Sequence, residues 1–186
     1  ETDETKTPEY QMLCKIYLLT KPGLAIPTAS FSDDAAKRFY HQWKALASAP
    51  AAAANRTALA LFDRFQEELS HCASRLSQAA EPCRQDESGF YLTHGDAGGN
   101  FFIGSERNYI FDWDEAMYAP LERDAWVMGC RGWARRLFND TLKAHGIPYR
   151  LKRERLAFYC YYMYFFYLGD ILEVHSIRDT SPKLID

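Results

Sequence analysis

Apolar residues recur at steps of three and four along most of the chain, which is the spacing of helices with one buried face. The pattern predicts a helix that begins near Pro120 and holds Trp126 to Met128, and further helices over about residues 33–48, 56–79, 131–145 and 150–174. Residues 1–9 are polar and are expected to be a disordered lead-in. Residues 13–19 are expected to be a strand or the end of a helix.

Two short segments between the helices predict strands. Phe90-Tyr91-Leu92 and Tyr109-Ile110-Phe111 are apolar and aromatic, and residues 104–108 between them have the composition of a turn. The second segment is expected to be the return strand of a hairpin, and a hairpin brings the residues at its two ends together. We therefore expect Asp96, ahead of the turn, to lie close to Asp112, which directly follows the return strand.

Oxygen-bearing side chains gather at this hairpin. Asp96 and Asn100 lie in the Gly-rich segment 94–100, and Asp112 ends the return strand. A carboxylate that accepts a proton, beside a carboxylate and an amide that hold magnesium, is the minimal equipment for transferring a phosphoryl group. Simpler interpretations exist: Asp96 as a turn residue that caps nearby amides, and Asp112 as an exposed acid. The presence of both aspartates on one hairpin favours the chemical interpretation.

The motifs resemble those of a known family. His94-Gly95-Asp96 with Asn100 resembles the catalytic loop of the aminoglycoside phosphotransferases, which are relatives of the protein kinases, and Phe111-Asp112-Trp113-Asp114 resembles their metal-binding strand end. Residues 115–124 are similar to the spectinomycin and hygromycin phosphotransferase branch. The resemblance implies an α+β, protein-kinase-like fold, mainly its helical C-terminal lobe with a short catalytic β-hairpin. Residues 26–186 would form this lobe and residues 1–25 a lead-in or a remnant of an N-terminal lobe or linker; the N-terminal nucleotide lobe is not evident.

The resemblance also implies a reaction and the residues that perform it. The reaction would move a phosphoryl group from ATP (or GTP), with Mg2+, to a hydroxyl of an aminoglycoside, an aminocyclitol or a similar small molecule. A cationic acceptor of this kind needs acidic partners, although acids in this segment are also compatible with an ordinary solvated loop. The implied site consists of the catalytic Asp96, the metal ligands Asn100 and Asp112, the substrate-binding Asp114 and Glu115, and the supporting residues His94 and Asp124.

One spacing departs from the family's pattern. Asn100 follows Asp96 by four residues, whereas these enzymes usually place it five residues after the catalytic aspartate. Gly98 and Gly99 are expected to absorb the difference through positive φ angles. No Gly-rich phosphate loop precedes the catalytic loop, and Lys15 is a poor candidate for the nucleotide-binding lysine. A non-catalytic binding protein that retains only this lobe therefore stays open as an alternative. A choline, homoserine or sugar kinase on the same fold also stays open, because the shared residues handle phosphate and metal rather than the acceptor.

Composition limits the partners. The 186 residues are 47% hydrophobic and carry a net charge of −3, which suits one packed domain or slightly more. The sequence contains neither a basic stripe nor an apolar stretch long enough to span a bilayer, so no nucleic acid and no membrane partner is expected. The five cysteines form no Cys-x-x-Cys pair and predict reduced thiols in the cytoplasm. The oligomeric state stays open, and the start at Glu1 suggests a processed, trimmed or partly observed product.

Overall fold

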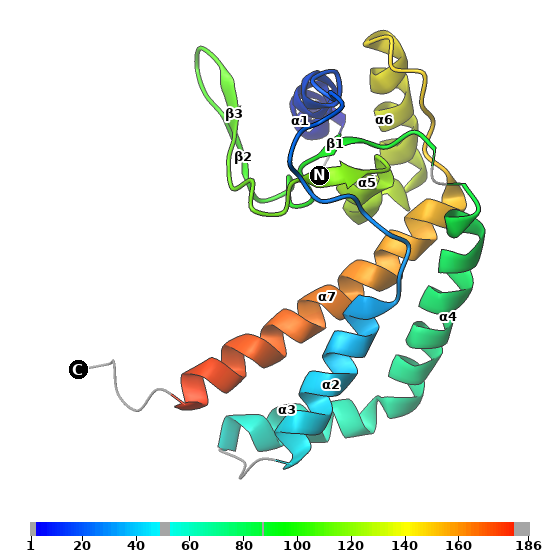
Figure 1. Cartoon of the computed structure of the whole chain (residues 1–186). Helices are drawn as coiled ribbons and strands as arrows, with labels where there is room; N and C mark the ends of the chain where they lie inside the picture. Colours follow the sequence, from blue (N-terminus) through cyan, green and yellow to red (C-terminus); the bar gives the residue numbers. More distant parts are fainter. Residues whose placement is uncertain (1–2, 49–52, 87, 181–186) are drawn as a thin grey trace. The chain divides into compact units, whose positions relative to one another are not determined.

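The chain forms two compact units. The part that the computed structural model describes comprises residues 3–48, 53–86 and 88–180 (Figure 1). The first unit consists of Glu1–Phe31 and Pro82–Tyr159, and the second of Ser32–Glu81 and Cys160–Asp186. Every candidate site residue from the sequence lies in the first unit.

The first unit packs three helices and two small sheets around one core. Its helices are α1 (Asp3–Tyr17), α5 (Glu122–Gly129) and α6 (Gly132–Ala144), together with the start of α7 (Arg153–Thr180). Helix α1 packs against α6 and strand β1, and α5 packs against α6 (Figure 1). The buried apolar side chains remove their surfaces from water, which stabilises the unit. They include Leu13, Tyr17, Leu121, Phe138, Leu142, Ile147 and Leu156.

Both sheets in the first unit are antiparallel pairs. Strand β2 (Phe101–Ile103) pairs with β3 (Asn108–Ile110), so the predicted hairpin is present. Strand β1 (Tyr91–Thr93) pairs with β4 (Met117–Ala119), which the sequence pattern did not predict. Pairing β1 with β4 brings together the two segments that flank the hairpin, and this encloses residues 94–116 between the two strands of one sheet.

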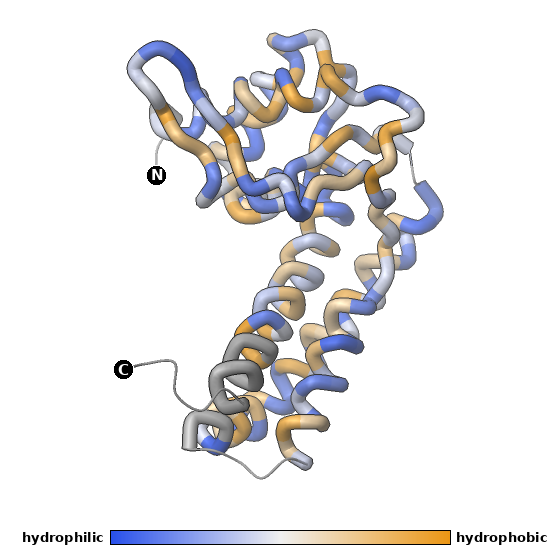
Figure 2. The backbone as a smooth tube through the Cα atoms, turned by 60° about the vertical axis from the view of Figure 1, so that its left-hand side comes forward, coloured by the Kyte–Doolittle hydropathy of each residue, from blue (hydrophilic) through white to orange (hydrophobic). Residues whose placement is uncertain are grey.

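The second unit has an aromatic core. It contains α2 (Asp34–Ser48), α3 (Ala53–Arg64), most of α4 (Gln66–Arg84) and the later part of α7. The ring of Phe39 lies 5.2 Å from that of Phe62 and 5.6 Å from that of Phe165, measured between centroids. Both hydrophobic and hydrophilic residues occur in successive turns of the second unit's helices (Figure 2), as expected for helices with one buried face.

The observed structure differs from the sequence expectations at three places. Residues 1–9 were expected to be disordered, but α1 begins at Asp3, and the buried pair of Lys6 and Glu9 lies at 2.9 Å in its polar first half. The helix predicted over residues 56–79 is two helices, which are separated at Phe65. Ser32, directly ahead of Asp33 and Asp34, has the residue type expected to cap the amides of α2, but its hydroxyl donates to the Asp34 carboxylate.

The predicted helices in the C-terminal half are present with shifted bounds. Helix α5 begins at Glu122, two residues after Pro120, and α6 ends at Ala144, two residues before Gly146. Gly146 has a φ of 70°, the left-handed conformation that commonly ends a helix. Over the described part of the chain, no helix combines the length and the apolar character that crossing a membrane requires.

Candidate active site

The backbone of Phe111 joins the two segments that carry the candidate aspartates. Its N–H donates to the carbonyl of Asn100 at 3.1 Å, and its carbonyl accepts from Nε2 of His94 at 2.9 Å. His94 and Asn100 are the two ends of the Gly-rich loop, and Asp112 directly follows Phe111. These two hydrogen bonds therefore hold the loop that contains Asp96 against the segment that contains Asp112.

His94 is fully buried and hydrogen-bonded through both ring nitrogens. Its Nδ1 accepts from the backbone N–H of Asp96 at 3.2 Å. A ring nitrogen that accepts carries no proton, so the proton lies on Nε2, which donates to the Phe111 carbonyl. The ring also lies 4.7 Å from the Trp113 ring between centroids. With no exposed surface, His94 can orient the loop but has no open path to a substrate.

Asp124 ties helix α5 to the loop. Its carboxylate accepts from the backbone N–H groups of His94 at 3.2 Å and Gly95 at 2.6 Å, and from the hydroxyl of Tyr17 at 3.0 Å. Hydrogen bonds to a charged acceptor are stronger than those between neutral groups. Burial, with a smaller contribution from the Asp124 charge, raises the pKa of Tyr17 well above its usual range. The Tyr17 hydroxyl therefore keeps its proton and remains a hydrogen-bond donor. The loop, α5 and α1 therefore meet at one carboxylate.

Gly95 is the loop position that only glycine can fill. Its φ is 91°, in the region where side chains are rarely accommodated. A Cβ added there would lie 2.0 Å from Nη1 of Arg123, because the guanidinium of α5 packs directly on the glycine. Arg123 is itself 5% exposed. Sequence reasoning missed this arginine; the signal available was a glycine between the loop's histidine and aspartate.

A tight turn accommodates the short spacing between Asp96 and Asn100. The N–H of Asn100 donates to the Ala97 carbonyl at 3.2 Å, and its Nδ2 donates to the Asp96 carbonyl at 2.8 Å and to Oδ2 of Asp96 at 3.2 Å. The expectation that Gly98 and Gly99 adopt positive φ angles is wrong. The turn closes through the asparagine side chain, and Asp96 remains exposed beside it.

Asp112 has the most unusual backbone in the site. With a φ of 63°, it is the single non-glycine residue with a positive φ in the described part of the chain. This conformation costs energy for most residues with a side chain, and aspartate tolerates it better than most. Strained backbone tends to occur where function requires a particular side-chain direction. Asp112 is also exposed, so its carboxylate is available to a ligand.

The donor set of Asn100 and Asp112 suits a magnesium ion. Both offer oxygen atoms, and Mg2+ prefers one or two protein oxygens together with phosphate oxygens and water. Because Nδ2 of Asn100 is turned toward Asp96, its Oδ1 is the atom left to bind a cation. Among the described residues, no group of three His, Cys, Asp or Glu side chains forms an all-protein metal site. Asn100 and Asp112 would supply two of the oxygen ligands of such an ion.

The two acidic residues predicted to bind substrate differ in their surroundings. Asp114 is exposed on the loop after Asp112. Glu115 instead forms an ion pair with Arg123, Nη2 to Oε2 at 3.2 Å, and its side chain is 45% exposed whereas that of Arg123 is 6% exposed. The pair connects the segment after Asp112 to helix α5, and the sequence alone did not indicate it.

A second polar network holds the chain that enters β1. Arg155, 1% exposed, donates to the Ser88 carbonyl at 3.1 Å and to the Tyr149 hydroxyl at 2.8 Å. Tyr149 in turn donates to the buried carboxylate of Glu122 at 2.6 Å. Burial raises the pKa of Glu122, whereas the hydrogen bond from Lys152 holds the pKa of Asp86 well below its usual range. The network fixes the start of β1 relative to α5.

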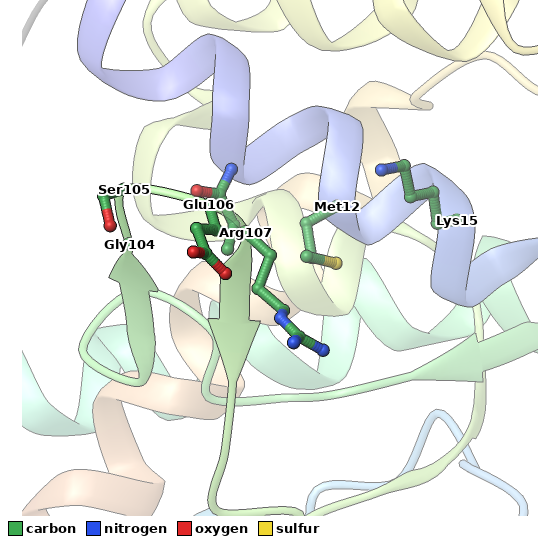
Figure 3. Close-up of a pocket in the computed structure, with 7 residues that line it drawn as sticks. Met12, Lys15, Gly104, Ser105, Glu106 and Arg107 are labelled. Carbon is green, nitrogen blue, oxygen red and sulfur yellow. The ribbon is translucent and has the colours of Figure 1, made fainter.

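A surface cavity of about 350 Å³ lies beside the hairpin turn (Figure 3). It is lined by Met12 and Lys15 of α1 and by Gly104 to Asn108 of the turn. Asp96, Asn100 and Asp112 do not line it. In the part of the chain that the structure describes, the cavity is therefore separate from the catalytic loop.

Comparison with solved structures identifies the fold. Two structures of spectinomycin phosphotransferase APH(9)-Ia are similar to this chain, at 17% identity each. The complex with ADP and spectinomycin has a TM-score of 0.72 and is matched over 91% of this chain and 54% of that one. The AMP-bound complex has a TM-score of 0.74, over 95% and 61%. The chain thus spans little more than half the length of these proteins, and the kinase-like fold class predicted from the sequence is confirmed.

Comparison of the sequence with families and with curated proteins gave two results. No curated protein matches the chain. The model of the phosphotransferase enzyme family, APH, matches residues 23–159, which is well over half of the chain and includes the whole loop and hairpin. The family predicted from the His94–Asn100 and Phe111–Asp114 motifs is therefore confirmed, and this chain belongs to the phosphotransferase enzyme family.

Proposed function

We propose that this chain is the catalytic and acceptor-binding part of an enzyme that transfers the γ-phosphoryl group of ATP to a hydroxyl of an aminoglycoside, an aminocyclitol or a similar small molecule. The observation that carries the proposal is the pair of hydrogen bonds from the Phe111 backbone, which holds the Asp96 loop against the strained Asp112. The arrangement supports the proposal because it joins the segments of Asp96, Asn100 and Asp112, and phosphoryl transfer requires a proton acceptor beside oxygen ligands.

In the proposed reaction Asp96 accepts the proton of the acceptor hydroxyl. The hydroxyl oxygen forms a bond to the γ-phosphorus, the bond from that phosphorus to the β–γ bridging oxygen breaks, and ADP leaves. Asn100 and Asp112 would hold Mg2+, which neutralises charge on the phosphate oxygens. Positioning and electrostatics, rather than covalent work by the protein, would lower the barrier.

The acidic segment after the hairpin supports a cationic acceptor. Asp114 is exposed directly after Trp113, which packs on the buried His94 ring. An exposed carboxylate on an anchored segment attracts a positively charged amino group without a large loss of side-chain freedom. One of the similar structures holds spectinomycin, an aminocyclitol of this kind. ATP as donor would place the reaction in the cytoplasm, in keeping with five cysteines that form no disulfide.

The test is phosphate transfer from ATP by the full-length protein, with and without Mg2+, to spectinomycin, hygromycin, other aminoglycosides and choline. We expect Mg2+-dependent transfer to an amino sugar or aminocyclitol, and a loss of about 10²–10⁴-fold in kcat for Asp96→Asn, which keeps the shape but not the basicity. The variant should still accept the hydrogen bond from Asn100. Transfer to choline alone would assign another small-molecule kinase, and the absence of both transfer and Mg2+-dependent nucleotide binding would favour a non-catalytic binding protein.

A further inference from the structure

Arg123 occupies the space in which a side chain of the catalytic loop would begin. A Cβ on Gly95 would lie 2.0 Å from Nη1 and 2.3 Å from Cζ of Arg123. The guanidinium is thus in contact with the backbone one residue before Asp96. Because Arg123 follows Glu122 in the first turn of α5 and is 5% exposed, its position is set by the packing of that helix. Displacement of the guanidinium would therefore change the position of the loop backbone.

The guanidinium connects three segments of the site. Its Nη2 pairs with Oε2 of Glu115 at 3.2 Å, and its Nη1 donates to the Thr93 hydroxyl at 3.4 Å. Thr93 donates in turn to the Met117 carbonyl at 3.0 Å, across the pair of β1 and β4. The buried guanidinium of Arg123 therefore contacts the end of β1, the loop and the segment after Asp112.

The two partners of the ion pair differ in their exposure to water, and this limits what Glu115 can bind. The Arg123 side chain is 6% exposed, so its charge has lost most of its contact with water, whereas Glu115 is 45% exposed. A cation withdrawn from water in this way depends on its partner carboxylate, and removing that partner is strongly unfavourable. A second cation brought to Glu115 by a substrate would compete with this pairing.

We infer that Arg123 and Glu115 are positioning residues: their ion pair holds the segment after Asp112 against the Asp96 loop, and Glu115 does not bind the acceptor. This inference rests on the proposed function and changes one expectation from the sequence, in which Glu115 contacts the substrate. Recognition of a cationic acceptor within this segment then falls to Asp114. Loss of the pair displaces the catalytic groups but leaves acceptor binding intact.

The kinetic test compares Glu115→Gln with Asp114→Asn in the full-length protein. Glu115→Gln is nearly isosteric and is expected to lower kcat by about 10–100-fold, because small displacements of reacting groups cost about this much. Its KM for the acceptor should stay within about threefold of wild type. Asp114→Asn should instead raise the acceptor KM. Glu67→Gln removes an exposed charge in α4 and serves as the matched control, with both constants unchanged.

A second measurement does not depend on activity. The Ala116 N–H donates to the Trp113 carbonyl at 2.9 Å, within the segment that the pair holds. Hydrogen exchange of this amide should be about tenfold faster in both Glu115→Gln and Arg123→Ala than in wild type and Glu67→Gln, in line with weaker local protection. Should Arg123→Ala fail to fold, Glu115→Gln carries this test alone.

Two results would overturn the inference. One is an acceptor KM raised at least tenfold in Glu115→Gln with an unchanged kcat, since this is the signature of a residue that binds substrate. The other is unchanged exchange at Ala116 in Glu115→Gln. If the wild-type protein transfers phosphate to no acceptor, the proposed function fails, and the exchange of Ala116 alone decides whether the pair holds the segment.

Discussion

Asp112 combines a strained backbone with an exposed carboxylate, and the two can be separated by substitution. Asp112→Gly removes the side chain and relieves the strain, whereas Asp112→Ala removes the carboxylate but keeps the Cβ. We expect Asp112→Gly to be more stable than Asp112→Ala by about 1 kcal/mol. Both variants should lose phosphate transfer. Urea unfolding and the transfer assay measure the two effects.

The opposite order of stability would mean that the φ of 63° at Asp112 carries little strain. Asp112→Asn serves as the control, because asparagine tolerates the same conformation and should keep most of the stability. If the carboxylate is a metal ligand, Asp112→Asn should still lose most of the Mg2+-dependent activity.

Asp124 accepts three hydrogen bonds, of which two come from the catalytic loop. Asp124→Asn keeps the shape but turns one acceptor into a donor, so at least one buried N–H or hydroxyl loses its partner. We expect the free energy of unfolding to fall by about 2–3 kcal/mol, as for hydrogen bonds to a charged group. Tyr17→Phe removes only one of the three bonds to this charged carboxylate and should cost less, about 1.5 kcal/mol. Equal losses in urea unfolding would contradict a special role for the two loop amides.

At the scale of elements, helix α6 has a glycine at each end, and the two should respond in opposite ways. Gly146, after the last turn, has a φ of 70°, so Gly146→Ala should lower the free energy of unfolding by about 1 kcal/mol. Gly132 begins the helix without a positive φ, and a Cβ there would meet Nη1 of Arg136 at 3.5 Å, an ordinary contact. Gly132→Ala should therefore raise the free energy by up to about 1 kcal/mol. Thermal unfolding of both variants tests this, and shifts of the same sign would contradict it.

Local patterns in the sequence predicted the elements whose causes are local. The helix over residues 33–48 and the hairpin could be predicted because periodicity and turn residues lie within each element. Strand β4 could not, because its partner β1 lies more than twenty residues earlier and pairing is decided in space. Only the end of helix α1 was among the expected elements: its first half was missed because the residues there are polar, and their burial includes an ion pair between Lys6 and Glu9 that the pattern does not indicate.

The residues of the candidate site likewise fall into those that local motifs predict and those that only contacts in space reveal. The catalytic loop and Asp112 carry motifs that can be read along the chain, whereas the contacts of Arg123 join residues from β1, the loop and the segment after the hairpin. An arginine in the first turn of a helix is usually an exposed residue, so only the close approach to Gly95 reveals its place. The predicted roles of the site residues remain predictions that the variants above test.

At the scale of the whole molecule, the stability should depend on pH through two acids of one network with opposite shifts. Burial raises the pKa of Glu122 above its ordinary value of 4.5. The folded protein then holds a proton that the unfolded chain has released, and the unfolding free energy falls as the pH rises through the folded pKa. The pKa of Asp86 is held below its ordinary value of 3.8, chiefly by the hydrogen bond from Lys152. The stabilisation that ionised Asp86 contributes to the folded protein is present above this ordinary value and is lost as the pH falls toward the folded pKa.

Urea unfolding from pH 3 to pH 8 can separate these two contributions. The stability of wild type relative to Glu122→Gln should decline as the pH rises above about 4.5, because the glutamine has no proton to lose. The stability of wild type relative to Asp86→Asn should decline in the other direction, as the pH falls below about 4. Parallel curves for wild type and Glu122→Gln above pH 4.5 would contradict a raised pKa at Glu122. In Glu122→Gln the hydrogen bonds from Tyr149 and Lys152 to residue 122 also change, which shifts the stability by an amount that does not depend on pH. The comparison therefore uses the slope of the unfolding free energy against pH and not its absolute value.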